Sequence, residues 1–171
     1  MRNLSFLFIA AICFLVVACK PGSPFKTAVQ YNDFIIGEQS KVVNLFKEYT
    51  NVLQSETSSE DADKSLKKCT EGMKKSIDTL SKAGGYNGNE EFVNAGKKLF
   101  EFYVKTINDE YGQIRKLQNK SKKISEADQK GIEQIAEKIA NDETPIHSAF
   151  LKAQEDFAKK NNIQLMPNLT Q

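Results

Sequence analysis

Three glutamates, the single histidine and one cysteine are the residues of this chain best placed to hold a metal ion. Glu38 and Glu110 interrupt apolar repeats of helical spacing, at slots where the repeat calls for apolar side chains. Glu143 and His147 are four residues apart, so they share one helical face. When the expected helices are aligned at their midpoints, Glu38, Cys69, Glu143 and His147 lie at a similar height along the bundle axis. Glu110 lies about 10 Å from them along that axis. Carboxylate, imidazole and thiolate groups are ligands of zinc and copper in proteins. One hypothesis is a mononuclear site with these ligands: Glu38, Cys69, Glu143 and His147.

The spacing around the histidine argues against a di-iron carboxylate centre. That centre takes a Glu-x-x-His motif from each of two helices. This chain has one histidine, and its spacing from the glutamate is Glu-x-x-x-His. Cys69 and His147 could in principle form a nucleophilic pair, but a cysteine on the apolar face of a helix is typical of an inert packing residue. The sequence therefore assigns no catalytic residue, and we expect no enzyme activity.

The carboxylate of Glu38 also admits a second interpretation. A buried carboxylate must be paired, protonated or reached by water. The preceding Gly37 costs its helix about 1 kcal/mol relative to alanine and can admit a close neighbour. One hypothesis is a small polar pocket with these members: Gly37, Glu38, Gln39, Ser40 and Glu110. The simpler interpretation is that Gly37 packs closely against Tyr103 or Phe150. Separately, the alternative to the metal site is that Glu38 turns to the edge of the apolar stripe and bonds a Lys, Tyr or Ser.

Apolar residues at alternating three- and four-residue spacings place these side chains on four helices. The expected ranges are 25–54, 60–83, 90–119 and 126–160. No segment alternates as a strand does, and short polar turns between amphipathic helices favour antiparallel packing. We therefore predict an all-α fold. It is an antiparallel up-down-up-down four-helix bundle over residues 25–162, followed by a C-terminal tail over residues 163–171.

Local signals mark the ends of these helices. Ser58 and Ser125 are each followed three residues later by an aspartate, which is the spacing of a capping box. Gly84 can take the left-handed conformation that ends a helix, and Asn89 can cap the next one. Pro145 removes one helical hydrogen bond. The last helix is therefore expected either to kink at this proline or to break just before it.

The first and third turns of such a bundle meet at the end away from the N-terminus. The acidic residues near that end are Glu56, Glu60, Asp61 and Asp63. The basic residues there are Arg115, Lys116, Lys120, Lys122 and Lys123. Opposite charges could dock the two turns, although solvated charges contribute little to stability. The alternatives are two independent solvated turns, or a basic patch for an acidic partner.

Residues 1–18 have the composition of an export signal. An apolar run of about 15 residues follows Arg2, which is within the range of a secretory signal and too short to span a membrane. Residues 16–19 (VVAC) resemble the lipobox of bacterial lipoproteins. The resemblance implies a cleaved signal peptide, a diacylglycerol thioether on Cys19 and a short tether over residues 19–24. The alternative is an ordinary secretory signal whose next residue happens to be cysteine.

Charge and cysteine content narrow the functional classes. Charged residues make up 27% of the chain, yet the formal net charge is only +2. A near-neutral chain that mixes both signs does not favour a nucleic-acid partner. Cys13 leaves with the leader and Cys19 carries the lipid, so Cys69 has no internal disulfide partner. We expect no cofactor beyond the covalent lipid.

Three stretches add a family resemblance: residues 31–40, 99–103 and 153–160. With the lipobox, they resemble a family of small helical bacterial surface lipoproteins that has no assigned activity. The resemblance implies a protein of the bacterial cell envelope that its lipid anchors to a membrane. The outer membrane is favoured, and the protein could face either the periplasm or the cell surface. We therefore expect a non-enzymatic binding or scaffolding role toward an envelope or surface protein or ligand. The alternative function is a metal-binding bundle that uses Glu38, Glu143 and His147.

Overall fold

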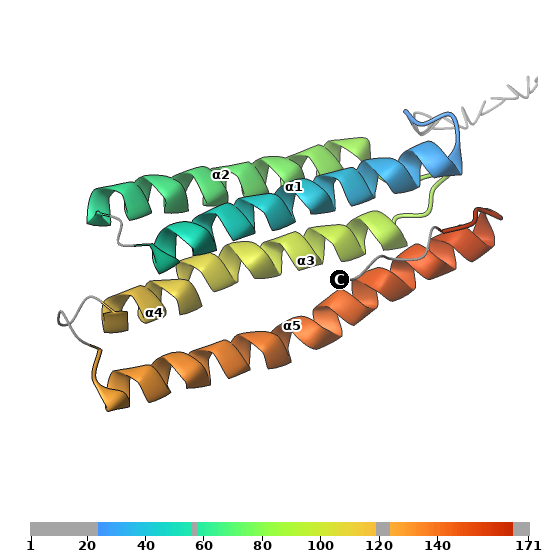
Figure 1. Cartoon of the computed structure of the whole chain (residues 1–171). Helices are drawn as coiled ribbons and strands as arrows, with labels where there is room; N and C mark the ends of the chain where they lie inside the picture. The colour runs from blue at the N-terminus through green and yellow to red at the C-terminus, as the bar shows by residue number, and fades with distance from the viewer. Residues whose placement is uncertain (1–23, 56–57, 119–123, 166–171) are drawn as a thin grey trace, which may run out of the picture.

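The computed structural model describes residues 24–55, 58–118 and 124–165. Five helices, drawn in Figure 1, have these bounds: α1 (Ala28–Gln54), α2 (Ser59–Ala83), α3 (Glu91–Asn108), α4 (Glu110–Gln118) and α5 (Glu126–Lys160). Within the described ranges there is no β-strand, only a bridge between Tyr86 and Asn89 in a tight turn. The all-α prediction is therefore confirmed. The predicted leader, with Cys19, lies outside the described residues.

The helices form four rods, because α4 continues the line of α3. Figure 1 shows these rods side by side, with consecutive rods running in opposite directions. α1 packs on α2 and α3, α2 packs on α3, and α5 packs on α3 and α4. The helical-bundle prediction thus agrees with the arrangement. None of the helices in the described ranges combines the length and the apolar character needed to cross a bilayer.

Three of the helices have a serine or threonine as their N-cap residue. The Ser58 Oγ atom accepts a hydrogen bond from the Asp61 amide, and the Ser125 Oγ atom accepts one from the Asp128 amide, both at 3.1 Å. The caps predicted at Ser58 and Ser125 are therefore confirmed. Thr27 caps α1 in the same way, so this helix begins three residues later than predicted. Asn89 is not the N-cap of α3, which is Glu90, although the Asn89 Oδ1 atom accepts a bond from the Glu91 amide at 2.9 Å. Gly84 ends α2 with a φ of 64°, a conformation that glycine adopts without steric cost.

The prediction of one continuous helix over residues 90–119 is wrong at one position. Asp109 separates α3 from α4, and its amide is shared between the carbonyl oxygens of Lys105 and Thr106. The preceding Asn108 donates its side-chain amide to the Val104 carbonyl at 2.6 Å. An asparagine side chain that bonds its own helix in this way competes with regular helical geometry. The line of the rod continues, because the Gln113 amide still donates to the Asp109 carbonyl at 3.1 Å.

Pro145 lies inside α5, which is continuous from Glu126 to Lys160. Figure 1 shows a change of direction near the middle of this helix. Proline has no N–H, so one carbonyl in the preceding turn loses its helical partner and the helix bends. The Thr144 hydroxyl donates to the Ala140 carbonyl at 2.8 Å, which adds a side-chain bond in that turn. Of the two expected outcomes, the helix is bent and not broken.

The best-packed part of the core is a group of aromatic rings at the end of the bundle where α1 begins. Its members are Tyr31, Tyr86, Phe92, Phe150 and Phe157. The rings of Tyr31 and Phe157 have centroids 5.2 Å apart, a normal spacing for attractive aromatic pairs. Burying one such phenylalanine is worth about 1.5–3 kcal/mol. We call this region the aromatic end.

Candidate functional site

Glu38 is buried in α1 and faces the seam with α2. The residue is only 5% exposed, and its Oε1 atom lies 2.5 Å from the Nζ atom of Lys41. The Lys41 side chain is 66% exposed, so the ammonium group stays in contact with water while it neutralises the buried carboxylate. The simpler expectation, that Glu38 bonds a lysine at the edge of the apolar stripe, is confirmed.

A surface hollow of about 500 Å³ lies beside Glu38, between α1 and α2. Its lining residues are Glu38, Lys41, Asn44, Leu45, Glu48, Gly72, Lys75, Ser76 and Thr79. We call it the α1–α2 hollow. It exists because α2 presents small side chains opposite the long side chains of α1. At Gly72 even a Cβ atom would lie 2.5 Å from the Leu45 Cδ1 atom, so Leu45 lies across the glycine and forms an apolar floor.

Two contacts fix the register of α1 against α2 along this hollow. The Cys69 thiol donates to the Leu45 carbonyl at 3.2 Å, and the Lys68 ammonium lies 2.7 Å from a Glu48 carboxylate oxygen. Burial raises the pKa of the Cys69 thiol to about 11, with a smaller contribution from the charge of Glu48. A thiol that stays protonated at neutral pH is a poor nucleophile and a poor metal ligand. Cys69 is therefore a packing residue that ties the two helices together.

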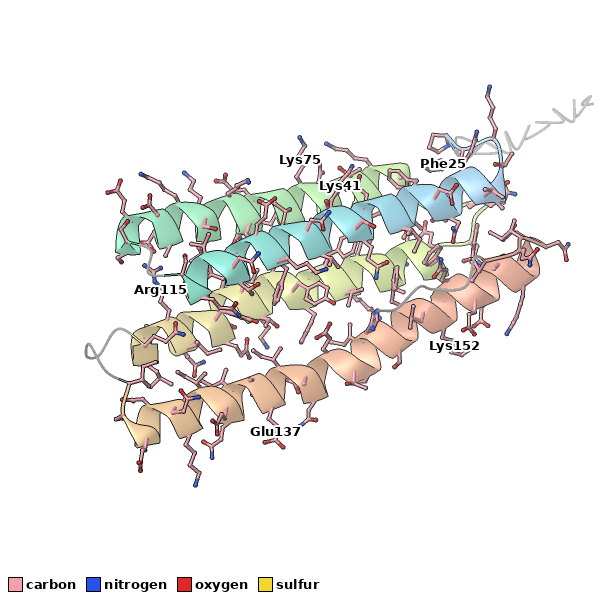
Figure 2. The ribbon with its side chains drawn as sticks, viewed as in Figure 1. Phe25, Lys41, Lys75, Arg115, Glu137 and Lys152 are labelled. Atoms are coloured by element: carbon pink, nitrogen blue, oxygen red, sulfur yellow. The ribbon has the colours of Figure 1, made fainter. Side chains whose placement is uncertain are left out.

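Lys75 carries the one charge on the lining of the hollow that makes no ion pair with any residue in the described ranges. Lys41 pairs with Glu38, and Glu48 pairs with Lys68. Figure 2 shows Lys41 and Lys75 projecting from the same face of the bundle, one from α1 and the other from α2. The hollow therefore combines a buried carboxylate with a free ammonium group at its rim.

The polar pocket predicted around Gly37 does not form as expected. Gly37 is exposed, and a Cβ atom built on it would meet nothing within 4 Å, so it packs against neither Tyr103 nor Phe150. Of the residues predicted to form the pocket, only Glu38 lines the hollow; Gln39 and Ser40 do not. The physical reason is helix geometry. Residues adjacent in sequence point about 100° apart around the axis, so four in a row cannot share one face.

Glu110 is the second buried seam carboxylate, and it faces α5 rather than the hollow. Its Oε1 atom accepts a bond from the Lys138 ammonium at 2.8 Å, and its Oε2 atom is buried without a hydrogen-bond partner among the described residues. The bond from Lys138 to Asp142, and then the bond to Glu110, raise the pKa of this lysine. Glu38 and Glu110 therefore follow the same rule, a seam carboxylate neutralised by a surface lysine, at two separate places.

The four predicted metal ligands are not brought together. The Tyr103 hydroxyl donates to Glu143 at 2.6 Å, and burial, followed by this bond, raises the pKa of Tyr103. Glu38 is paired with Lys41 on the other side of α1, and the Cys69 thiol is bonded to a backbone carbonyl. No group of three or more His, Cys, Asp or Glu residues that could hold a metal occurs among the described residues. Aligning helix midpoints gave neither the directions of these side chains nor all of their heights, because Cys69 lies beside Leu45, seven residues along α1 from Glu38.

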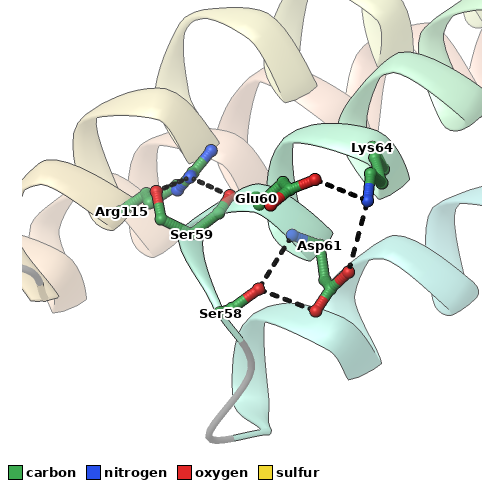
Figure 3. Close-up of polar contacts among 6 residues, drawn as sticks. All are labelled: Ser58, Ser59, Glu60, Asp61, Lys64 and Arg115. Carbon is green, nitrogen blue, oxygen red and sulfur yellow. Dashed lines mark hydrogen bonds and ion pairs between the residues drawn. The ribbon is translucent and has the colours of Figure 1, made fainter.

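At the end away from the N-terminus, one predicted contact between the turns is present (Figure 3). Arg115 of α4 donates to the Ser59 carbonyl at 2.9 Å and to the Ser59 hydroxyl at 2.8 Å. It also pairs with Asp63, which the figure does not draw. The Arg115 side chain is only 16% exposed. Glu60 and Asp61 instead pair with Lys64 of their own helix. The other members of the two predicted charge groups that fall in residues 56–57 and 119–123 lie outside the described residues.

Sequence reasoning found Glu38 but missed the α2 side of the hollow. Gly72, Ser76 and Thr79 recur at spacings of four and three, which is a stripe of small residues along one helical face. That stripe is the signal that could have located the hollow. It could not show which helix lies opposite, because this depends on the packing of the whole bundle.

Comparisons with known proteins identify no relative of this chain. A scan against protein-family models, a search of curated proteins and a search of solved structures each give no match.

Proposed function

We propose that this chain is a lipid-anchored lipoprotein of the bacterial envelope whose helical bundle has a binding or scaffolding role and no enzymatic one. The lipobox-like residues 16–19 support the anchor, as does the family resemblance of the three helical stretches. The chain from Cys19 to the start of α1 at Ala28 can span at most about 30 Å. The aromatic end therefore faces the membrane, and the opposite end points away from it.

One observation carries the binding role: the α1–α2 hollow, of about 500 Å³, holds a buried carboxylate beside an unpaired lysine. The volume is within the range of small-molecule sites. Elsewhere in the interior, reactive groups are used to hold helices together, as with the Cys69 thiol on the Leu45 carbonyl and Tyr103 on Glu143. This supports binding rather than catalysis.

Mass spectrometry of the protein purified from bacterial membranes tests the anchor. We expect a mature chain that begins at Cys19 and carries diacylglycerol, and a Cys19→Ala variant that carries no lipid and leaves the membrane fraction. An unmodified, soluble wild-type chain would refute the lipoprotein assignment.

Affinity capture from detergent-solubilised envelopes tests the binding role. The lipidated protein should recover an envelope component that an unrelated lipoprotein of similar size does not recover. Equal recovery by the two proteins would count against a binding role toward a stable envelope component.

A further inference from the structure

The α1–α2 hollow is lined by charges of both signs, namely Glu38, Lys41 and Glu48 of α1 and Lys75 of α2. The Glu38 carboxylate is nearly buried and paired with Lys41, and the Lys75 ammonium makes no ion pair in the described part of the chain. A ligand with only negative charge would meet Glu38, and one with only positive charge would meet Lys75. Like charges at close range are unfavourable, so the hollow selects a ligand that carries both signs.

The axial separation of these two charges follows from the helix register. Leu45 lies opposite Gly72, and the Cys69 thiol bonds the Leu45 carbonyl, so α1 and α2 are antiparallel neighbours here. With Leu45 level with Gly72, Glu38 is level with Thr79, and Lys75 lies four residues before Thr79 on α2. At the rise of an α-helix, the backbone positions of Glu38 and Lys75 are then about 6 Å apart along the axis. The two charged termini of a short peptide are separated by a similar distance.

Lys41 can change partners when such a ligand arrives. Its side chain is 66% exposed, and it holds Glu38 through a pair of residues three apart on one helix. The Glu38 side chain is only 6% exposed, so its charge must stay paired, and Lys41 can leave only as another cation takes its place. A ligand ammonium group can replace Lys41 on Glu38. The released lysine can then join Lys75 on the ligand carboxylate, which leaves every charge paired.

We propose that the α1–α2 hollow binds a short peptide with a free amino terminus and a free carboxyl terminus. The ammonium group binds Glu38, the carboxylate binds Lys75 and Lys41, and small side chains lie on Leu45 above Gly72. The proposal deepens the binding role given above and rests on it.

Calorimetric titration of the mature lipidated chain in detergent micelles tests the ligand class. The probe is alanyl-alanine, whose methyl side chains suit the small apolar floor. N-acetyl-alanyl-alanine lacks the ammonium group, and alanyl-alanine amide lacks the carboxylate. We expect saturable one-to-one binding of the free dipeptide and a loss of about tenfold or more for each blocked form, the effect of one charged hydrogen bond. No saturable heat at millimolar dipeptide, or equal binding of a blocked form, would overturn the proposal.

Two matched pairs of variants test the site. Glu38→Gln and Lys75→Gln should each weaken dipeptide binding by about tenfold. Glu110→Gln removes another buried seam carboxylate paired with a lysine, and Lys67→Gln removes another exposed lysine of α2, both outside the hollow. These two controls should bind as wild type does. Because Lys75 is exposed, its replacement leaves the fold intact, so unchanged binding by Lys75→Gln would contradict the site.

The outcomes separate this proposal from the proposed function. A chain that binds the dipeptide but carries no lipid would refute the anchor and leave the hollow as a peptide site. A lipidated chain that captures an envelope partner, but binds no dipeptide, would refute the peptide site and leave the binding role.

Discussion

The two ends of the bundle are packed by different kinds of side chain. At the aromatic end, rings from α1, α3 and α5 are almost fully buried against one another. At the opposite end, α4 meets the first half of α5, and we call this region the far end. Its contacts are the Leu117 side chain beside Gly131 and the ion pair between Glu110 and Lys138. The isoleucines of this half of α5 are only partly buried: Ile132, Ile135 and Ile139.

The contrast within α5 is instructive because its apolar pattern is similar on both sides of Pro145. All four buried residues of the helix follow the proline: Phe150, Gln154, Phe157 and Ala158. Before the proline, the partners are the nine-residue α4 and, at Glu143, the Tyr103 hydroxyl of α3. A periodic pattern thus shows which face of a helix points inward, but the size of the opposing surface decides how much of that face is buried.

The largest effect should come from removing a ring at the aromatic end. Phe92→Ala deletes a side chain that contacts the rings of Tyr31, Phe150 and Phe157, and it should lower the free energy of unfolding by about 3–5 kcal/mol. Denaturant unfolding followed by circular dichroism measures the loss. A cost below that of the matched change at the far end, Ile135→Ala, would show that the aromatic end is not the better packed one.

Alkaline pH should weaken the aromatic end next. Burial, followed by the nearby charge of Glu90, raises the pKa of Tyr31 from its ordinary value of 10.0 to about 12. The folded state therefore holds this proton more tightly than the unfolded chain does. The stabilisation is complete below pH 10 and is lost as the pH rises toward 12. Tyrosinate absorbance should follow unfolding in this window in wild type, and a Tyr31→Phe variant should lose that part of the pH dependence.

Two buried tyrosines of α1 allow a finer comparison. The Tyr31 hydroxyl donates to the Gly84 carbonyl at 3.0 Å, whereas the Tyr49 hydroxyl, nearer the far end, is buried with no hydrogen-bond partner in the described structure. Tyr31→Phe should cost about 1 kcal/mol, because it removes a satisfied bond. Tyr49→Phe should cost nothing or should stabilise the protein, because it removes a desolvated hydroxyl. Thermal melting of the two variants checks the difference, and equal losses would contradict it.

The smallest effect should come from the isoleucines of the far end. Ile135→Ala removes a partly buried side chain that is not part of the main core, and it should cost about 1 kcal/mol or less. The loss is small because water already reaches this face. Urea unfolding measures it, and a loss as large as that of Phe92→Ala would mean that both ends belong to one equally packed core.

Much of the fold could be predicted because its signals are local. Ser58 and Ser125 cap the helices that they were expected to cap, and Gly84 ends α2. Side-chain periodicity identified the helical faces, and the pairing of Glu38 with a lysine followed from the cost of burying a lone carboxylate. The interruption at Asp109 was missed because it depends on an asparagine side chain that bonds its own helix.

The site was less predictable because it depends on how helices are oriented relative to one another. The proposed metal ligands were expected to share a height, but Cys69 lies beside Leu45, seven residues from Glu38. Glu38 faces α2, while Glu143 faces Tyr103 on α3. The hollow likewise needs Gly72 to lie opposite Leu45, which is a matter of register between two helices. Neither the helix that a side chain faces nor the register between two helices is encoded in the pattern of one helix alone.

Pro145 divides α5 into two halves that need not unfold together. The missing hydrogen bond in this turn removes part of the cooperativity that would carry fraying from one half into the other. The first half, from Glu126, can therefore detach with α4 while the second half stays attached to the rings of the core. The far end would then be a short segment that opens locally while the rest of the bundle remains folded.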